Sequence, residues 1–143
     1  MIPDYRDIVF VNGCFDVLHY GHVQLLEYAR SLGSALVVGI DSDSRVASRK
    51  PGRPINKWFH RAKVVSALRC VDSVYAFNSD EELEMLINYW RPQFLVVGAD
   101  WKGKKIVGAE YAREVRFFER YEELSSTSII DRCHLFNQRN EIT

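Results

Sequence analysis

Apolar residues are concentrated in five short segments spaced along the chain. Each segment is rich in β-branched or aromatic residues, and together they cover residues 8–11, 35–40, 73–77, 94–97 and 115–119. Most are apolar at every position, which is typical of strands buried on both faces of a parallel sheet. The last segment, VRFFE, is interrupted by charge, which favours an edge strand. The pattern therefore predicts five strands.

Helical patterns lie between and after these strands, over about residues 21–32, 57–69, 80–90 and 126–137. The segment ASRKPGRPIN, residues 47–56, carries glycine and two prolines and is predicted as a loop. Alternating strands and helices predict a single α/β domain over residues 1–143. We expect a doubly wound, Rossmann-like, five-stranded parallel sheet, with its ligand site beyond the carboxyl ends of the central strands.

Composition and charge narrow the class of function. Hydrophobic residues make up 47% of the 143 positions, enough for one core, and 19 basic residues balance 19 acidic ones. This balance gives no ground to expect binding to nucleic acid or to a membrane surface. The three cysteines are far apart in sequence, no apolar segment is long enough to span a bilayer, and the first residues show no signal-peptide pattern. We therefore expect a cytoplasmic protein.

The densest polar chemistry follows the first predicted strand, in the sequence FVNGCFDVLHYGH at residues 10–22. A helix that begins there offers unpaired N–H groups and the positive end of its dipole, so the turn suits an anion such as phosphate. His19 and His22 flank Gly21, and an imidazole can donate hydrogen bonds to phosphate oxygens. Alternatively, His22 is a core residue, since it is in phase with Leu25 and Ala29 on the helix.

Two other phosphate-binding motifs are excluded or weak. The dinucleotide fingerprint needs G-x-G-x-x-G at this turn, and only Gly13 and Gly21 are present, eight residues apart. The segment GADWKGKK, residues 98–105, has part of the P-loop spacing, but Lys105 stands where Ser or Thr would bind the metal. The turn over residues 12–22, the histidine turn, is therefore the main candidate site.

The segment GCFDVLHYGH resembles the H-x-G-H signature of the nucleotidyltransferase superfamily. Further segments are similar, in order and spacing, to the bacterial heptose 1-phosphate adenylyltransferase domain: GRPIN (52–56), HRAKVVSALRCVDSVYAF (60–77), IVGAE (106–110) and LSSTSII (124–130). Glycerol 3-phosphate cytidylyltransferase is a related family, similar through the histidine motif and GADW (98–101). The resemblance implies an enzyme that joins a nucleoside monophosphate to a phosphorylated acceptor and releases pyrophosphate. It implies ATP with a D-glycero-D-manno-heptose 1-phosphate type of acceptor, and CTP with glycerol 3-phosphate as the alternative.

The resemblance and the residues together suggest three groups of site residues. The catalytic group is His19, His22, Lys50 and Arg61, where Arg61 is expected to reach phosphate through its guanidinium. The nucleotide-binding group is Asn12, Gly13, Cys14, Phe15, Gly21, Gly98, Asp100, Ser125, Ser126 and Thr127. The acceptor-binding group is Asp16, Asp43, Arg53 and Trp101.

Some of these residues have a structural alternative. Asp16 and Asp43 suit turns, and Ser125, Ser126 and Thr127 suit a helix cap before an apolar run. Trp101 suits ordinary packing. Capping does not exclude phosphate binding at the last helix, because a capped helix N-terminus can also hold an anion.

The implied partners are a nucleoside triphosphate, a phosphorylated sugar or polyol, and Mg²⁺ bound mainly through the nucleotide phosphates, with no protein metal site. The resemblance also implies a homodimer. Two positions depart from the family: Val97 stands where heptose-type relatives have lysine, and Glu123 where most have glycine. These departures leave open a second class of function, a nucleotide-binding sensor without turnover.

Overall fold

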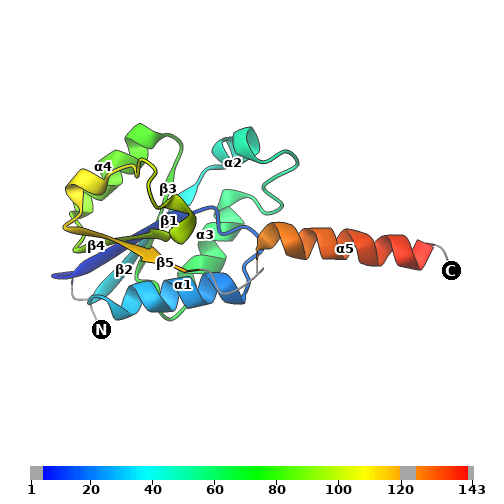
Figure 1. Ribbon diagram of the computed structural model, residues 1–143, viewed down its shortest axis with the longest axis horizontal. Coiled ribbons are helices and arrows are strands. Elements are labelled where there is room, and N and C mark those ends of the chain that lie inside the picture. The colour runs from blue at the N-terminus through cyan, green and yellow to red at the C-terminus, as the bar shows by residue number, and fades with distance from the viewer. Residues whose placement is uncertain (1–4, 120–124, 142–143) are drawn as a thin grey trace.

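The computed structural model describes residues 5–119 and 125–141 (Figure 1). Its centre is a five-stranded sheet in the order β3-β2-β1-β4-β5, and every neighbouring pair of strands is parallel. The strands are β1 Ile8–Gly13, β2 Ala35–Asp41, β3 Ser73–Phe77, β4 Phe94–Gly98 and β5 Glu114–Phe118. The predicted Rossmann-like α/β architecture and its five strands are confirmed.

Helices cover both faces of the sheet. Helices α1 (Tyr20–Ser31) and α3 (Trp58–Ser66) pack on one face, over a core that includes Leu26 and Val65. Helix α4 (Asp80–Trp90) packs on the other face through Leu83 and Ile87. Figure 1 shows α1 and α4 on opposite sides of the strands. This is the doubly wound arrangement that the alternating pattern predicted.

Strand β1 lies at the centre of the sheet because the chain reverses direction there. From β1 the chain passes outward to β2 and β3, then crosses back to β4 on the other side of β1. The side chains of Val9 and Phe10 are completely buried, on opposite faces of the sheet. A parallel sheet opens a crevice at such a reversal, beyond the carboxyl ends of the two strands, and ligands bind there in open α/β sheets. The histidine turn follows β1 at this point.

One element differs from the sequence-based prediction. A short helix α2 (Asp43–Arg49) follows β2 and includes the first part of the segment predicted as a loop. Ser42 caps it by accepting the N–H of Arg45, and Asp43 complements the dipole in its first turn. Pro51 follows the C-cap residue Lys50 and prevents further helix. Seven residues give less than two full turns of pattern, which is too few for helical periodicity to be recognised.

The edge strands and the last helix can also be compared with the sequence-based predictions. β5 is an edge strand as predicted, and β3 forms the opposite edge, which leaves Tyr75 and Ala76 exposed. Helix α5 (Ser126–Glu141) continues past the predicted end at residue 137 and projects away from the body of the protein (Figure 1). No helix in residues 5–119 and 125–141 is long and apolar enough to cross a membrane.

Candidate active site

The turn after β1 has an unusual backbone. Phe15 and Val17 both adopt the left-handed region, with φ angles of 51° and 53°. This region is uncommon for residues with a side chain and most costly for a β-branched one, at about 1 to 3 kcal/mol. The Phe15 ring folds back against the strand end, where a Cβ on Gly13 would lie 3.1 Å from it. Gly13 therefore permits the close packing that shapes this turn.

His19 and His22 form a reciprocal cap at the start of α1. The Nδ1 atom of His19 accepts the N–H of Gly21 at 3.0 Å, and the Nδ1 atom of His22 accepts the N–H of His19 at 3.1 Å. The ring centroids lie 3.9 Å apart. An imidazole nitrogen that accepts a hydrogen bond carries no proton, so in the neutral ring the proton sits on Nε2. Each histidine is thereby fixed as an Nε2–H donor at a helix N-terminus.

His22 also packs beside Phe15, with ring centroids 5.4 Å apart, and is half-buried. It therefore packs against the core residue Phe15 and also caps the helix, and its contact with phosphate stays a prediction. Its capping contact requires the ring to face the turn rather than the interior of the sheet.

Asp16 joins the histidine turn to the loop that precedes α3. Its buried carboxylate accepts the N–H groups of Ile55 and Asn56 at 2.6 and 2.9 Å, and Nε of Arg53 at 2.9 Å. Burial by itself would raise the pKa of Asp16, but these backbone and guanidinium hydrogen bonds together hold it below its ordinary value. The carboxylate is therefore ionised and occupied by protein donors. This geometry favours the structural alternative for Asp16 over contact with an acceptor.

Arg61 lies beneath the same turn and is only 2% exposed. Its guanidinium donates to the carbonyl oxygens of Cys14 and Asn56 at 2.7 and 2.8 Å, and to Oδ1 of Asp43 at 2.7 Å. The sequence predicts that this guanidinium reaches phosphate. In the structure its three nitrogens instead donate to protein acceptors, and the side chain is buried.

Asp43 holds the start of α3 from outside that helix. Besides Arg61, its Oδ1 accepts the N–H of Trp58 at 2.7 Å, where the N-cap residue Lys57 makes no side-chain cap. Asp43 therefore links α2 with α3, and like Asp16 it is engaged by protein donors.

The first turn of α5 contacts the histidine turn. Oγ of Ser126 donates to the carbonyl oxygen of Asp16 and lies 3.3 Å from that of Val17. Arg53 and Thr127 approach to 3.5 Å. Oγ of Ser125 accepts the N–H of Ser128 at 3.0 Å, so the cap that the sequence predicted is present. Segments more than 100 positions apart thus meet at the carboxyl end of β1.

Lys50 and the residues after β4 complete the surroundings. Lys50 is exposed at the end of α2. Burial raises the pKa of the Cys14 thiol, and the charge of Arg61, and to a smaller extent that of Lys50, opposes this effect. Gly98 ends β4, and exposed Asp100 and Trp101 form the short turn that follows it. Because β4 neighbours β1, these residues flank the same crevice.

Neither of the two positions that depart from the family pattern contributes a described polar side chain to the site. Val97, on β4, is half-buried and packs with the apolar residues under α4, so it contributes no charge. Glu123 lies outside the described residues. The backbone N–H groups of Ile55 and Asn56, which position Asp16, were missed because backbone donors carry no signal in residue type.

Among the described residues, no group of three or more His, Cys, Asp or Glu side chains is arranged to hold a metal ion. Asp16, the buried carboxylate nearest the turn, already accepts three hydrogen bonds. The donor set suits an anion, since it consists of imidazoles, a helix N-terminus and a lysine.

The chain matches known proteins over most of its length. The family model described as cytidylyltransferase-like matches residues 10–132. The bifunctional protein HldE of Nitratiruptor sp. is 47% identical over 128 residues, and that of Campylobacter concisus is 48% identical over the same number. Each alignment covers 89% of this chain but only 28% and 27% of the relative, so the chain spans less than a third of their length.

Solved structures agree with the fold. A lipopolysaccharide core biosynthesis protein from Thermoplasma volcanium superposes with a TM-score of 0.65 at 27% identity, covering 81% of this chain and 98% of that one. A pantothenate synthetase from Thermus thermophilus superposes at 0.62 with 18% identity, covering 89% and 62%, and at that identity it supports the fold alone. The family match, the relatives and the histidine turn agree: the chain belongs to the cytidylyltransferase-like family of nucleotidyltransferases.

Proposed function

We propose that this protein transfers the adenylyl group of ATP to a sugar 1-phosphate of the heptose type, releasing pyrophosphate and forming an activated nucleotide sugar. The observation that carries the proposal is the reciprocal histidine cap, which fixes two Nε2–H donors at a helix N-terminus. The similarity to two HldE proteins, at 47% and 48% identity, supports the choice of acceptor and nucleotide.

The reaction needs alignment and charge stabilisation rather than a covalent enzyme intermediate. An oxygen of the acceptor phosphate attacks the α-phosphorus of the nucleotide and forms a new P–O bond. The bond from the α-phosphorus to the bridging oxygen breaks on the opposite side, and pyrophosphate leaves with the electron pair. Negative charge gathers on the α-phosphate oxygens as the bonds exchange.

We assign His19 and His22 the stabilisation of that charge. Their Nδ1 atoms are occupied by the cap, so the Nε2–H donors keep one orientation and need not reorganise during the reaction. The N-terminus of α1 adds the positive end of its dipole to the same place, although the N–H groups of Gly21 and His22 are already bonded to His19. We assign His22 the contact with the α-phosphate, with His19 beside it.

The charged residues of the site have two roles in this proposal, contact with phosphate and positioning of the turn. We assign Lys50 a direct phosphate contact, because it is exposed at the end of α2, whose residue Asp43 is bonded to Arg61 beside the histidine turn. Arg61, Asp16 and Asp43 position the turn and the loop through hydrogen bonds to protein groups. Arg53 is shared, since Nε holds Asp16 and Nη1 approaches Thr127.

The remaining predicted residues are assigned to binding. The turn residues Asn12, Gly13, Cys14 and Phe15, with Gly21, bring the backbone close to the nucleotide phosphates. Ser125, Ser126 and Thr127 at the start of α5 face the β and γ phosphates. Gly98 and Asp100 flank the base and Trp101 the acceptor. Mg²⁺ would be held mainly by the triphosphate and would neutralise part of its charge. We further propose a cytoplasmic homodimer.

Magnesium-dependent pyrophosphate release tests the proposal. ATP and CTP are each offered heptose 1-phosphate and glycerol 3-phosphate, with the wild-type chain, His22→Ala, and the matched control His134→Ala on the exposed part of α5. We expect release with ATP and the heptose, loss in the first variant and full activity in the second. Release only with CTP and glycerol 3-phosphate would assign the alternative substrates. Nucleotide binding without release in any pairing would favour the sensor.

A further inference from the structure

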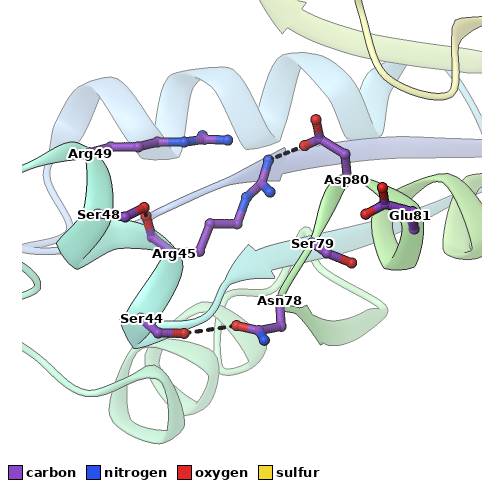
Figure 2. Close-up of a pocket in the computed structure, with 8 residues that line it drawn as sticks. All are labelled: Ser44, Arg45, Ser48, Arg49, Asn78, Ser79, Asp80 and Glu81. Atoms are coloured by element: carbon purple, nitrogen blue, oxygen red, sulfur yellow. Dashed lines mark hydrogen bonds and ion pairs between the residues drawn. The ribbon is translucent and has the colours of Figure 1, made fainter.

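Helix α2 is held against the start of α4 by one buried arginine. Nε of Arg45 donates to Oδ1 of Asp41 at 2.7 Å, and Nη2 pairs with Oδ1 of Asp80 at 2.5 Å. The Arg45 and Asp41 side chains are 12% and 11% exposed, and Asp80 is 59% exposed. Figure 2 shows the guanidinium of Arg45 directed toward Asp80. Both residues line a pocket of about 470 Å³.

The charge state and packing of Arg45 fit this bridging position. Burial disfavours a charged guanidinium, but the hydrogen bonds to Asp80 and Asp41 raise the pKa of Arg45 above its ordinary value. The guanidinium also lies over the ring of Phe77, 5.3 Å from its centroid. A planar group with several donors can bond to two carboxylates at once, which an ammonium group on a flexible stem does poorly.

A second contact ties the same end of α2 to the same junction. Oδ1 of Asn78 accepts hydrogen bonds from Ser42 and from Ser44, the latter at 2.8 Å. The N–H of Ser42 donates to the carbonyl oxygen of Phe77 at 2.9 Å. The position of α2 is therefore fixed by the carboxyl end of β3 and the start of α4.

Helix α2 in turn carries two residues of the candidate active site. Asp43, at its first position, caps α3 and holds Arg61. Lys50, its C-cap residue, has its N–H bonded to the carbonyl oxygen of Val46 at 2.9 Å. A shift of this seven-residue helix relative to α4 would displace both residues.

We propose that Arg45 is a positioning residue for nucleotidyl transfer, which bridges Asp41 and Asp80 so that α2 presents Lys50 to the phosphates. The inference rests on the proposed function for the role of Lys50. The bridge itself, from α2 to α4, is independent of the chemistry. Arg45 touches no substrate in this assignment and acts through the helix that carries Lys50.

Hydrogen exchange measured by mass spectrometry tests the bridge without any substrate. Asp80→Asn weakens only the α4 side and leaves Asp41 paired, so this variant keeps the buried charge compensated. Arg45→Lys keeps the charge and loses the planar fork. We expect the amides of Val46 and Lys50 to exchange faster in both variants, while the amides of α1 keep their rates. Unchanged exchange in α2 in both variants would overturn the proposal.

Kinetics then tests the connection to Lys50. We expect Arg45→Lys to lower kcat by about 10- to 100-fold, in the range that misplacement of a group by about 1 Å can cause. In a Lys50→Gln background the same change should cost less than threefold, because the group that it positions is already gone. An equal factor in both backgrounds would show a merely structural role and overturn the connection.

An ion pair far from α2 provides the control for the kinetic measurement. Arg30→Gln removes a pair with Asp72, whose atoms lie 3.3 Å apart at the opposite end of the sheet, and we expect it to leave kcat unchanged. If the wild-type chain releases no pyrophosphate with any substrate pair, the proposed function fails while hydrogen exchange still decides whether Arg45 orders α2.

Discussion

Arg53 donates from Nε to Oδ2 of Asp16 at 2.9 Å, although the two residues are 37 positions apart, and both side chains are almost completely buried. The pair joins the histidine turn to the loop before α3, so the two segments move as one unit. Breaking a buried pair on one side costs more than the pair contributes, because the remaining charge is left without compensation.

Asp16→Asn should therefore destabilise the fold by about 3 to 5 kcal/mol at pH 7. The folded-state pKa of Asp16 is lowered, so its contribution is complete above the unfolded-state value of about 3.9 and is lost as the pH falls through the folded-state value. Urea denaturation at pH 7, 5 and 3 should show the difference between wild type and variant shrinking only below about pH 4. A difference that stays constant down to pH 3 would contradict the ionised, hydrogen-bonded state of Asp16.

The two nitrogens of His22 can be separated by substitution. In His22→Asn an amide oxygen takes the place of Nδ1 and preserves the cap, but no donor reaches the place of Nε2. Pyrophosphate release should fall by about 100- to 1,000-fold while the thermal unfolding midpoint stays close to that of wild type. His22→Gln, whose amide nitrogen reaches the place of Nε2, should retain more activity and less stability. The opposite ranking would show that His22 acts through the cap alone.

Arg61→Met should destabilise the domain by about 3 to 5 kcal/mol, because it leaves the carbonyl oxygens of Cys14 and Asn56 and the carboxylate of Asp43 without their donor. Chemical denaturation measures the loss, with Arg69→Met on the exposed side of the following segment as the control. If Arg61→Met instead lowers activity with unchanged stability, the guanidinium binds substrate and the positioning role is wrong.

Ser126→Ala removes the hydroxyl that ties α5 to the carbonyl oxygens of Asp16 and Val17. The expected cost is about 0.5 to 1.5 kcal/mol in the free energy of unfolding, with faster hydrogen exchange in the first turn of α5. Ser31→Ala, at the end of α1, is the matched control, because its hydroxyl bonds only to the local carbonyl oxygen of Tyr28. Equal effects of the two substitutions would mean that the long-range contact contributes no more than a local hydrogen bond within one helix.

The sequence predicted the elements whose signal is local. Residues 35–40 are apolar at nearly every position, and β2 is buried along its whole length. Helix α2 is too short for its periodicity to be recognised, and the contacts that hold it, such as Arg45 with Asp80, join residues 35 positions apart. Resemblance identified Arg61 as a site residue, but residue type does not reveal whether a guanidinium faces solvent or protein acceptors.

For Asp16, too, residue type alone left two roles open. Its turn-holding alternative was considered from sequence, and the structure favours it through three donors from the following loop. His22 could not be assigned to core or site from phase alone, since a helix start allows both.

Helix α5 contacts the histidine turn through its first turn, and its sixteen residues make a rod about 24 Å long at 1.5 Å per residue. Side chains from Asp131 to Arg139 are exposed. Such a rod acts as a lever whose pivot is the hydroxyl of Ser126 on the carbonyl oxygens of the histidine turn. A lateral force on its exposed end therefore acts as a torque on the contact between Ser126 and the histidine turn, beside the residues that we assign to catalysis.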